Sequence, residues 1–244
     1  MNISIIVPCY NEGKNIKILI NKIKNIISNC KIVIVDDSLN NNTVKEVENL
    51  ENVHCILRGK KMGRGSAVLE GIDYSIKNYD SDLFIEMDAD LSHDPSELTE
   101  NIKSFQNFKC DLLISSRYLK KSKIKNWSVA RRIFSLLANF LAKQLLRIPV
   151  TDYTNGYRIY SKSAANHIVK KCGKIGDGFI ILSEILVELH FNNFKINEVS
   201  TIFINRIRGE SSVNFNEIYN SFVGLFKVLK LKLSIIKKTK TNFS

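Results

Sequence analysis

The first part of the chain alternates between short apolar runs and longer amphipathic segments. The short runs are rich in Ile and Val and end at polar loops, which is typical of buried strands. Between them, apolar residues recur three or four positions apart, as they do on one face of a helix. We predict strands at residues 3–7, 31–35, 53–57 and 83–87, and helices at residues 15–27, 44–50 and 66–77. This order predicts a doubly wound α/β sheet, in which ligands bind beyond the C-terminal ends of the strands.

The alternation continues in the second half, with one helix that is unusually apolar. We predict helices at residues 96–105, 129–147 and 180–190, a short strand after the turn at 154–158, and strands at 111–115 and 196–204. Helix 129–147 is apolar on nearly all sides, with basic pairs at its start and end. Such a helix is either internal or lies in a membrane interface with its charges at the headgroups. The pattern alone leaves both alternatives open.

The C-terminal tail carries a basic amphipathic pattern. One helical stripe is apolar: Phe215, Ile218, Tyr219, Phe222, Phe226, Leu229 and Ile236. Lysines interrupt and follow this stripe, so the helix lies on an anionic membrane surface, packs on a partner, or is a plain surface helix. The longest uncharged stretch of the basic middle segment is 133–142, which is too short to span a bilayer. We expect a catalytic domain at 1–212, with halves at 1–116 and 117–212, and a basic tail at 213–244.

The positive charge is concentrated in the middle of the chain. The chain of 244 residues has a net charge of +12. Residues 117–174 hold 14 Lys and Arg but a single acid, Asp152. Residues 1–116 hold 13 basic and 17 acidic side chains. A local surplus of this kind indicates a localised anionic partner rather than general solubility.

The five cysteines form no C-x-x-C pair and no zinc spacing. Free, buried thiols in a cytoplasmic protein are the expected state. The chain enters a strand pattern directly after Met1, and we expect no signal peptide.

Two carboxylates, Asp88 and Asp90, follow the apolar run at 83–87. Side chains at positions i and i+2 of a strand face the same way, so an extended strand would aim both at one point. Two like charges this close need a bound cation or a solvated turn. Oxygen ligands without Cys or His favour a hard ion such as Mg²⁺ or Mn²⁺, often shared with phosphate. Polar clusters at 8–12 and 36–37 end two other strands at the same predicted edge, which favours a ligand site.

Eight short motifs occur in a specific order. They are V-P-C-Y-N-E (7–12), V-D-D-S (35–38), G-R-G-S-A (63–67), M-D-A-D-L-S-H (87–93), S-S-R-Y (115–118), W-S-x-x-R-R (127–132), D-Y-T-N-G-Y-R (152–158) and R-I-R-G-E-S (206–211). Together they resemble family-2 glycosyltransferases of the GT-A fold, and within them the dolichol-phosphate mannose synthase branch. The resemblance covers about residues 3–215. It implies a Rossmann-like mixed sheet flanked by helices, with a C-terminal interface helix and no transmembrane span.

The resemblance also implies three groups of site residues. The nucleotide-sugar group is Pro8, Tyr10, Glu12, Val35, Asp37, Lys61, Gly63, Asp88, Ala89 and Asp90. The acceptor-phosphate group is Arg117, Arg131, Ser135 and Arg158. The catalytic group is Asp88, Asp90, Arg117 and Arg206, with Asp88 and Asp90 holding Mg²⁺ or Mn²⁺. A cation there would neutralise the diphosphate leaving group, and arginines can clamp an acceptor phosphate bidentately.

Three positions depart from the family pattern. Ser92 stands where the family has Gln, Ser212 where it has Lys, and Asn42 where it has Asp. An acceptor phosphate is already ionised at neutral pH, so the reaction needs no protein base, and His93 is the only histidine near the expected site. Asp152 would either orient an arginine or the sugar, or cap a turn.

The expected function is transfer of a hexose, with mannose from GDP-mannose expected first, to a polyprenyl or dolichyl phosphate at the cytosolic membrane face. A separate membrane subunit could anchor the enzyme. The alternative is a family-2 transferase that uses UDP-glucose or UDP-GlcNAc, or that modifies a soluble or cell-surface glycan. A nucleic-acid partner is not expected, because the aromatic pattern of single-strand binders is missing. The first turn is not G-x-G-x-x-G and the glycine loop lacks G-K-[ST], which excludes a dinucleotide dehydrogenase and a P-loop NTPase.

Overall fold

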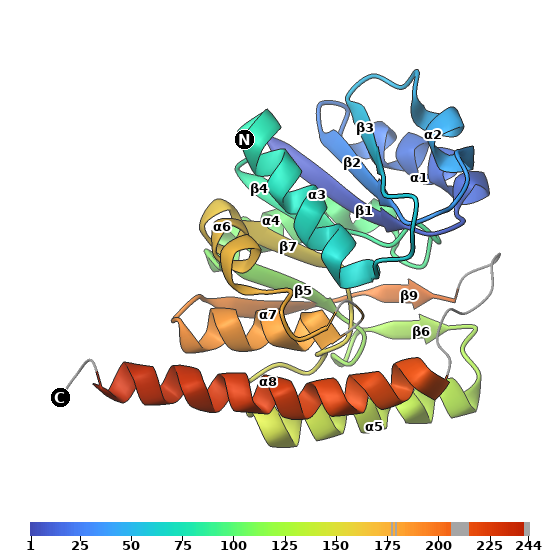
Figure 1. The fold of residues 1–244 in the computed structure, drawn as a ribbon. Coiled ribbons are helices and arrows are strands. Elements are labelled where there is room, and N and C mark those ends of the chain that lie inside the picture. The colour runs from blue at the N-terminus through green and yellow to red at the C-terminus, as the bar shows by residue number, and fades with distance from the viewer. Residues whose placement is uncertain (177, 179, 206–214, 242–244) are drawn as a thin grey trace.

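A computed structural model describes the backbone of residues 1–176, 178, 180–205 and 215–241, and in the last helix the side chains of 223–238 (Figure 1). Seven strands form the central sheet in the order β3-β2-β1-β4-β7-β5-β8. All neighbouring pairs are parallel except those of β7, which runs antiparallel between β4 and β5. The strands are β1 (Ile3–Cys9), β2 (Lys31–Asp36), β3 (Val53–Leu57), β4 (Leu83–Glu86), β5 (Leu112–Ser116), β7 (Arg158–Ser161) and β8 (Ile196–Ser200). The α/β sheet that the alternation predicted is confirmed, and the antiparallel β7 makes it the mixed sheet that the resemblance implied.

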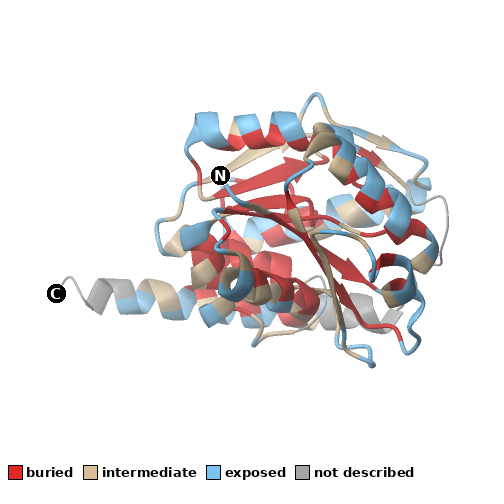
Figure 2. Cartoon of the chain, turned by 90° about the horizontal axis from the view of Figure 1, so that it is seen from above, coloured by how far each residue is buried: buried red, intermediate tan, exposed pale blue. Residues whose placement is uncertain are grey.

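Helices cover both faces of this sheet. They are α1 (Gly13–Ile26), α2 (Asn42–Val47), α3 (Arg64–Tyr79), α4 (Leu98–Phe108), α5 (Val129–Leu146), α6 (Lys162–Lys171), α7 (Ile180–Phe191) and α8 (Phe215–Thr241). One apolar core joins the sheet to α3, α6 and α7, and a second joins it to α1 and α4. The inner strands β1, β2, β4, β5 and β7 are almost entirely buried, whereas the edge strands β3 and β8 are mostly half-buried (Figure 2). Gly71 allows α3 to lie close to the sheet, because a Cβ there would come within 2.7 Å of Ile6.

Some predicted boundaries change in the structure. The expected strand at 196–204 is divided into β8 and a separate strand, β9 (Ile202–Ile204), which pairs with β6 (Lys123–Lys125) in a small second sheet. A 3₁₀ turn at Pro95–Glu97 precedes α4, since the Asp94 carboxylate accepts a hydrogen bond from Ser96 N–H and Pro95 takes the first helical position. These shifts leave the order of the larger elements unchanged.

Helix α5 is an exposed helix with an apolar surface. Its buried residues are only Asn139, Ala142 and Leu146. Seven large apolar side chains are exposed: Val129, Ile133, Phe134, Leu136, Leu137, Phe140 and Leu141. The core-helix alternative is therefore wrong for α5.

Helix α8 packs beside α5 and α7 (Figure 1). It places Leu225 and Val228 in the main core and leaves Phe226 and Leu233 exposed. The buried face is thus offset from the stripe that the sequence suggested, whose first four residues have side chains outside the described set. In the described part of the chain, no helix is long and apolar enough to cross a membrane.

Candidate active site

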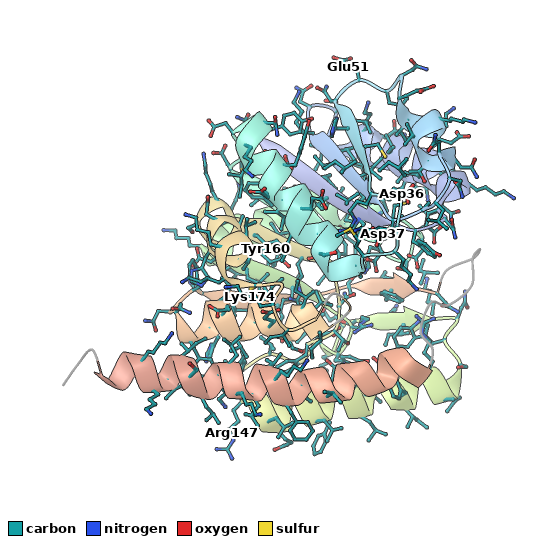
Figure 3. All side chains as sticks on the ribbon, viewed as in Figure 1. Asp36, Asp37, Glu51, Arg147, Tyr160 and Lys174 are labelled. Atoms are coloured by element: carbon teal, nitrogen blue, oxygen red, sulfur yellow. The ribbon has the colours of Figure 1, made fainter. Side chains whose placement is uncertain are left out.

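The C-terminal ends of β1, β2 and β4 lie at one edge of the sheet. In the parallel register, Cys9 on β1 pairs with Asp36 on β2, and Ile6 on β1 pairs with Glu86 on β4. The polar residues that follow these strands therefore start from neighbouring positions. Figure 3 shows Asp36 and Asp37 at this edge, next to the first turn of α3. This is the edge at which α/β sheets bind ligands.

Asp88 and Asp90 lie in a turn, since β4 already ends at Glu86. The expectation that extended backbone aims both side chains at one point is therefore wrong, and the turn alternative holds, while their place at the sheet edge stands. The Ser92 N–H donates to Asp90 Oδ1 (3.0 Å), and Leu91 has a φ of 63°. A positive φ is uncommon for leucine. The hydrogen bonds around the turn are what hold it in this shape.

The turn fits a divalent cation shared with another ligand. In the described part of the chain, no cluster of three or more His, Cys, Asp or Glu side chains could hold a metal ion by itself. Asp88 and Asp90 supply carboxylate oxygens, which suit Mg²⁺ and Mn²⁺. Since Mg²⁺ is commonly held by one or two carboxylates together with phosphates and water, the two residues suffice for a cation bound with a phosphate-bearing ligand.

His93 supports this turn from behind. It is buried, and its Nδ1 accepts a hydrogen bond from the Asp88 N–H (3.0 Å). Its proton is therefore on Nε2, which donates to Asn155 Oδ1 (3.1 Å). The ring also stacks on Tyr157 at 5.1 Å. Both nitrogens are occupied by structural contacts, so His93 positions the turn and does not act as a base.

Asp37 anchors the glycine loop that precedes α3. Its Oδ2 accepts hydrogen bonds from the Met62 and Gly63 N–H groups, both at 2.8 Å, and its Oδ1 accepts from the Arg58 guanidinium. Gly63 adopts a φ of 95°, a conformation that favours glycine. Asp37 thus holds the loop that a diphosphate would meet, and its contact with a nucleoside stays a prediction.

Of the other residues predicted to bind the nucleotide sugar, some lie at the surface and some in the core. Tyr10 is exposed, and the Lys61 ammonium lies over its ring, 5.2 Å from the centroid. The structure thereby brings the end of β1 and the glycine loop together, with Glu12 at the start of α1. Pro8, Val35 and Ala89 are buried. Val35 packs under α3 with Val33 and Ala67, so its side chain does not line the site, and we correct that assignment.

Arg117 and Asp152 form a buried ion pair near the turn of Asp88 and Asp90. Asp152 Oδ2 accepts from Arg117 N (2.9 Å) and Nε (2.8 Å), and Oδ1 accepts from Arg117 Nη2 (2.8 Å). Asp152 Oδ1 also accepts from the N–H groups of Thr154 and Asn155. Burial alone would raise the pKa of Asp152, but Arg117 and these hydrogen bonds outweigh it and hold the pKa below its ordinary value. Asp152 therefore both orients the arginine and caps the turn.

Trp127 lies between two arginines. The guanidinium carbon of Arg131 is 4.5 Å from the Trp127 ring centroid, and that of Arg117 is 5.4 Å away. Arg131 Nη1 donates to Asn205 Oδ1 (2.7 Å), which ties it to the segment after β9. The Trp127 Nε1–H is buried and has no hydrogen-bond partner among the described residues.

Ser135 completes the group on α5. Its Oγ accepts a hydrogen bond from the Tyr118 hydroxyl (2.6 Å), and the Tyr118 ring lies 5.5 Å from the Arg117 guanidinium. Three of the four residues predicted for the acceptor phosphate, Arg117, Arg131 and Ser135, are thus brought together through Trp127 and Tyr118.

Arg158 is not part of this cluster. It is fully buried, and its guanidinium donates to the carbonyl oxygens of Asn155, Tyr153 and Leu182. These bonds hold β7 to the neighbouring turn and to α7, and they leave Arg158 no path to an acceptor. We correct its assignment to a structural role. Arg206 and Ser212 lie outside the described residues.

Two residues of the site lie outside the three predicted groups. Trp127 is the only tryptophan of the chain and lies four positions before the pair Arg131-Arg132, which was a signal in the sequence. Arg64 belongs to the basic glycine motif, which resembles a phosphate cradle, and is the first residue of α3; its guanidinium donates to Asp88. Only the structure shows this contact.

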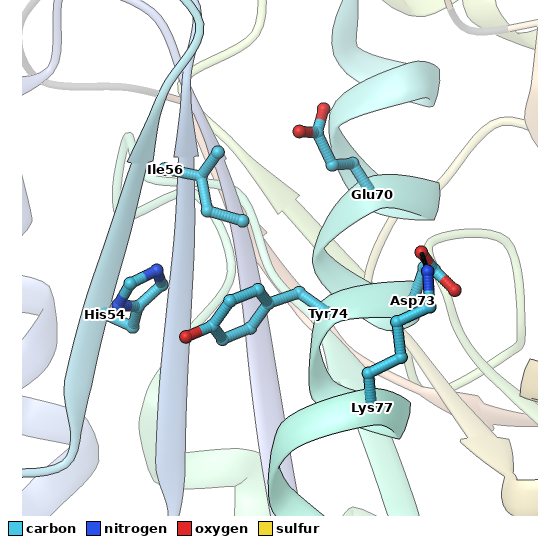
Figure 4. A pocket seen from close by; sticks show the side chains of 6 residues that line it. All are labelled: His54, Ile56, Glu70, Asp73, Tyr74 and Lys77. Carbon is cyan, nitrogen blue, oxygen red and sulfur yellow. Dashed lines mark hydrogen bonds and ion pairs between the residues drawn. The ribbon is translucent and has the colours of Figure 1, made fainter.

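A hollow of about 410 Å³ between β3 and α3 lies apart from these residues (Figure 4). It is lined by His54, Ile56, Glu70, Asp73, Tyr74 and Lys77. The His54 and Tyr74 rings stack across it at 4.3 Å. None of the predicted site residues that the structure describes lines it.

Known proteins resemble this chain in sequence. Its residues 4–169 match the family described as Glycosyl transferase family 2. A dolichol-phosphate mannosyltransferase of Pyrococcus furiosus is 32% identical over 94% of the chain, and the chain spans 64% of that relative's length. A polyprenol monophosphomannose synthase of Mycolicibacterium smegmatis is 30% identical over 92% of the chain and 84% of its own length.

Solved structures with low sequence identity share the fold. Glucosyl-3-phosphoglycerate synthase from Mycobacterium tuberculosis, in complex with Mn²⁺, UDP-glucose and phosphoglyceric acid, superposes with a TM-score of 0.68 at 15% identity. The match covers 94% of this chain and 80% of that one. A second structure of the synthase gives a TM-score of 0.62. The chain therefore belongs to glycosyl transferase family 2, and it is a glycosyltransferase built on a GT-A fold.

Proposed function

We propose that this enzyme transfers a hexose from a nucleotide sugar to a polyprenyl phosphate, with mannose from GDP-mannose as the preferred donor. The observation that carries the proposal is the position of the Arg117 guanidinium, which is buried among aromatic rings beside the turn of Asp88 and Asp90. The His93–Asn155 hydrogen bond joins the turn of Asp88 and Asp90 to the turn that holds Arg117. Sugar donor and anionic acceptor would thus meet at one edge of the sheet. The names of the two sequence relatives support this substrate class.

The donor side uses the acidic turn and the glycine loop. Asp88 and Asp90 would hold Mg²⁺ or Mn²⁺, which supplies charge neutralisation for the departing nucleoside diphosphate. Lys61 and the N–H groups of the first turn of α3, which starts at Arg64, would face the same negative charge. Tyr10 would lie along the nucleoside.

The acceptor side uses Arg117 and Arg131. A phosphate monoester carries negative charge at neutral pH, and planar guanidinium groups bind its oxygens through charge-assisted hydrogen bonds. Asp152 keeps Arg117 in a fixed orientation, which reduces the conformational freedom lost on binding. The acceptor oxygen is itself the nucleophile, so the reaction needs no general base. This agrees with the structural role of His93.

The exposed face of α5 would place the enzyme on a membrane, where a polyprenyl chain resides. Phe140 is 57% exposed and Leu137 is 55% exposed. Arg132 near one end of α5, and Lys143 and Arg147 at the other, are also exposed. Apolar side chains would enter the headgroup region while the cations meet anionic lipids. We propose peripheral binding at the cytosolic face, with or without a separate membrane subunit.

A transfer assay tests the proposal. Purified protein is incubated with radiolabelled GDP-mannose, UDP-glucose or UDP-GlcNAc, with Mg²⁺ or Mn²⁺, and with dolichyl or undecaprenyl phosphate. We expect label in the butanol phase, strongest with GDP-mannose and abolished by EDTA. Label that stays with a soluble glycan would support the alternative acceptor class. No lipid-linked label with any of the three donors would overturn the proposal.

A further inference from the structure

The first residue of α3, Arg64, contacts the acidic turn directly. Its Nε and Nη2 donate to Asp88 Oδ1 at 2.9 and 2.7 Å, and its Nη1 donates to Glu86 Oε1 at 2.6 Å. The side chain is 13% exposed, and that of Glu86 is 1% exposed. One guanidinium is therefore the shared counterion of two carboxylates and offsets part of their charge; one of the two is a proposed ligand of the cation.

The surrounding residues are shaped for this contact. Glu86 Oε2 accepts a hydrogen bond from the buried Tyr160 hydroxyl (2.7 Å), which fixes the other oxygen of this carboxylate. Gly156 leaves room for the guanidinium, because a Cβ at this position would lie 1.8 Å from Arg64 Nη2. Gly156 has no left-handed φ, so close approach, and not backbone conformation, requires a glycine here.

We propose that Arg64 is an internal counterion of Asp88 that makes the cation and the nucleotide diphosphate bind together rather than separately. The inference rests on the proposed metal site at Asp88 and Asp90. A divalent cation bound there alone would sit beside a fixed positive charge, and the two repel each other. A diphosphate brings negative charge that compensates both, and its oxygens also suit a guanidinium. Each of the two ligands then raises the affinity for the other by the same factor.

Linked binding of the cation and the nucleotide would help a transferase to release its nucleotide product. Without the repulsion from Arg64, a cation could stay bound at Asp88 after the nucleotide has left. With Arg64 as its counterion, Asp88 stays paired until the donor arrives, and the cation leaves with the nucleotide product. The coupling is thus a property of Arg64, and a variant that moves Arg64 away from Asp88 should weaken it.

Mn²⁺ binding, followed by the electron paramagnetic resonance signal of the free ion, tests the inference without any turnover. For the wild type we expect weak Mn²⁺ binding alone and much tighter binding with GDP or UDP. The Gly156→Ala variant displaces the guanidinium without changing any charge. We expect it to bind Mn²⁺ alone roughly tenfold more tightly than the wild type, and to gain less from the nucleotide.

A second variant pair covers the risk of misfolding. Arg64→Gln alone leaves Glu86 buried without its cation, which is strongly destabilising. The double variant Arg64→Gln/Glu86→Gln removes both charges and should show the same gain in Mn²⁺ affinity as Gly156→Ala. Lys162→Gln, at an exposed pair with Asp80, removes one positive charge elsewhere and should leave Mn²⁺ binding unchanged. Circular dichroism is used to check that each variant is folded.

The outcomes separate this inference from the proposed function. Unchanged or weaker Mn²⁺ binding in both Gly156→Ala and the double variant, together with nucleotide-dependent binding in the wild type, would overturn the role of Arg64 and leave the metal site standing. If the wild type binds no Mn²⁺ even with GDP and UDP, the metal site itself is wrong, and the inference falls with it.

Discussion

The buried pair of Arg117 and Asp152 gives the sharpest prediction. In Asp152→Asn, an amide replaces a carboxylate whose two oxygens accept five hydrogen bonds from the N–H groups of Arg117, Thr154 and Asn155. One oxygen becomes an NH₂ group that faces other donors, and Arg117 loses its counterion. The side chains of Arg117 and Asp152 are 7% and 0% exposed, so water cannot compensate.

Breaking a buried ion pair by removing one partner costs about 3–5 kcal/mol. For a chain of this size each kcal/mol lowers Tm by roughly 2–4 °C, so we expect a fall of about 6–20 °C. Thermal unfolding followed by circular dichroism measures it. Asp80→Asn, at an exposed ion pair, is the matched control and should leave Tm unchanged. A Tm for Asp152→Asn within about 2 °C of the wild type would refute the reasoning.

The pH dependence follows from the same contact. The folded pKa of Asp152 lies below its value in the unfolded chain. The stabilisation is therefore fully present above an unfolded pKa of about 3.9, and it is lost as the pH falls through the lower folded pKa. The difference in Tm between the wild type and Asp152→Asn should be constant near neutral pH and shrink below about pH 4. A difference that stays constant down to pH 2 would contradict the assignment.

Three further predictions concern the proposed function. Asp90→Asn should reduce transfer by about 10²-fold or more and weaken Mn²⁺ binding in the presence of GDP, and undiminished metal-dependent transfer would contradict the site. Leu137→Glu on α5 should lower cosedimentation with anionic vesicles by about tenfold without unfolding the protein, since half-burial of a leucine contributes about 1 kcal/mol and a charge opposes insertion. Ile18→Glu, at a similarly exposed position on α1, is its control and should bind vesicles as the wild type does. Because Trp127 is the only tryptophan, the fluorescence of the protein should change on addition of farnesyl phosphate but not of farnesol. The Trp127→Phe variant should raise the KM for the acceptor and change the KM for the donor little. Equal effects on both KM values would refute its place on the acceptor side.

Local sequence was sufficient for much of the fold. The runs of Ile and Val and the helical spacing of apolar residues gave the central strands and helices, because side-chain period depends on backbone geometry alone. The same pattern failed at Asp88 and Asp90. A strand and a tight turn differ there by a few dihedral angles, which the hydrogen bonds of His93 and Ser92 select.

Charged residues were harder to place. Arg117 and Arg158 both stand in basic, motif-like surroundings, yet one lies among the rings of the site and the other is bonded to carbonyl groups inside the fold. Composition reports the sign of a charge and not the direction of its side chain. That direction depends on which distant segment supplies the partner, and for Arg158 the partners include α7.

The α/β alternation, the order of the motifs, the basic middle segment and the two carboxylates after the fourth strand could all be read from the sequence. Each of these depends on neighbours along the chain. Which faces are covered and which side chains meet depends instead on how the elements pack. This packing exposes the apolar side of α5, pairs Arg117 with Asp152, and brings Arg64 past Gly156 to Asp88. These contacts join residues far apart in the chain, and only packing of the whole fold fixes them.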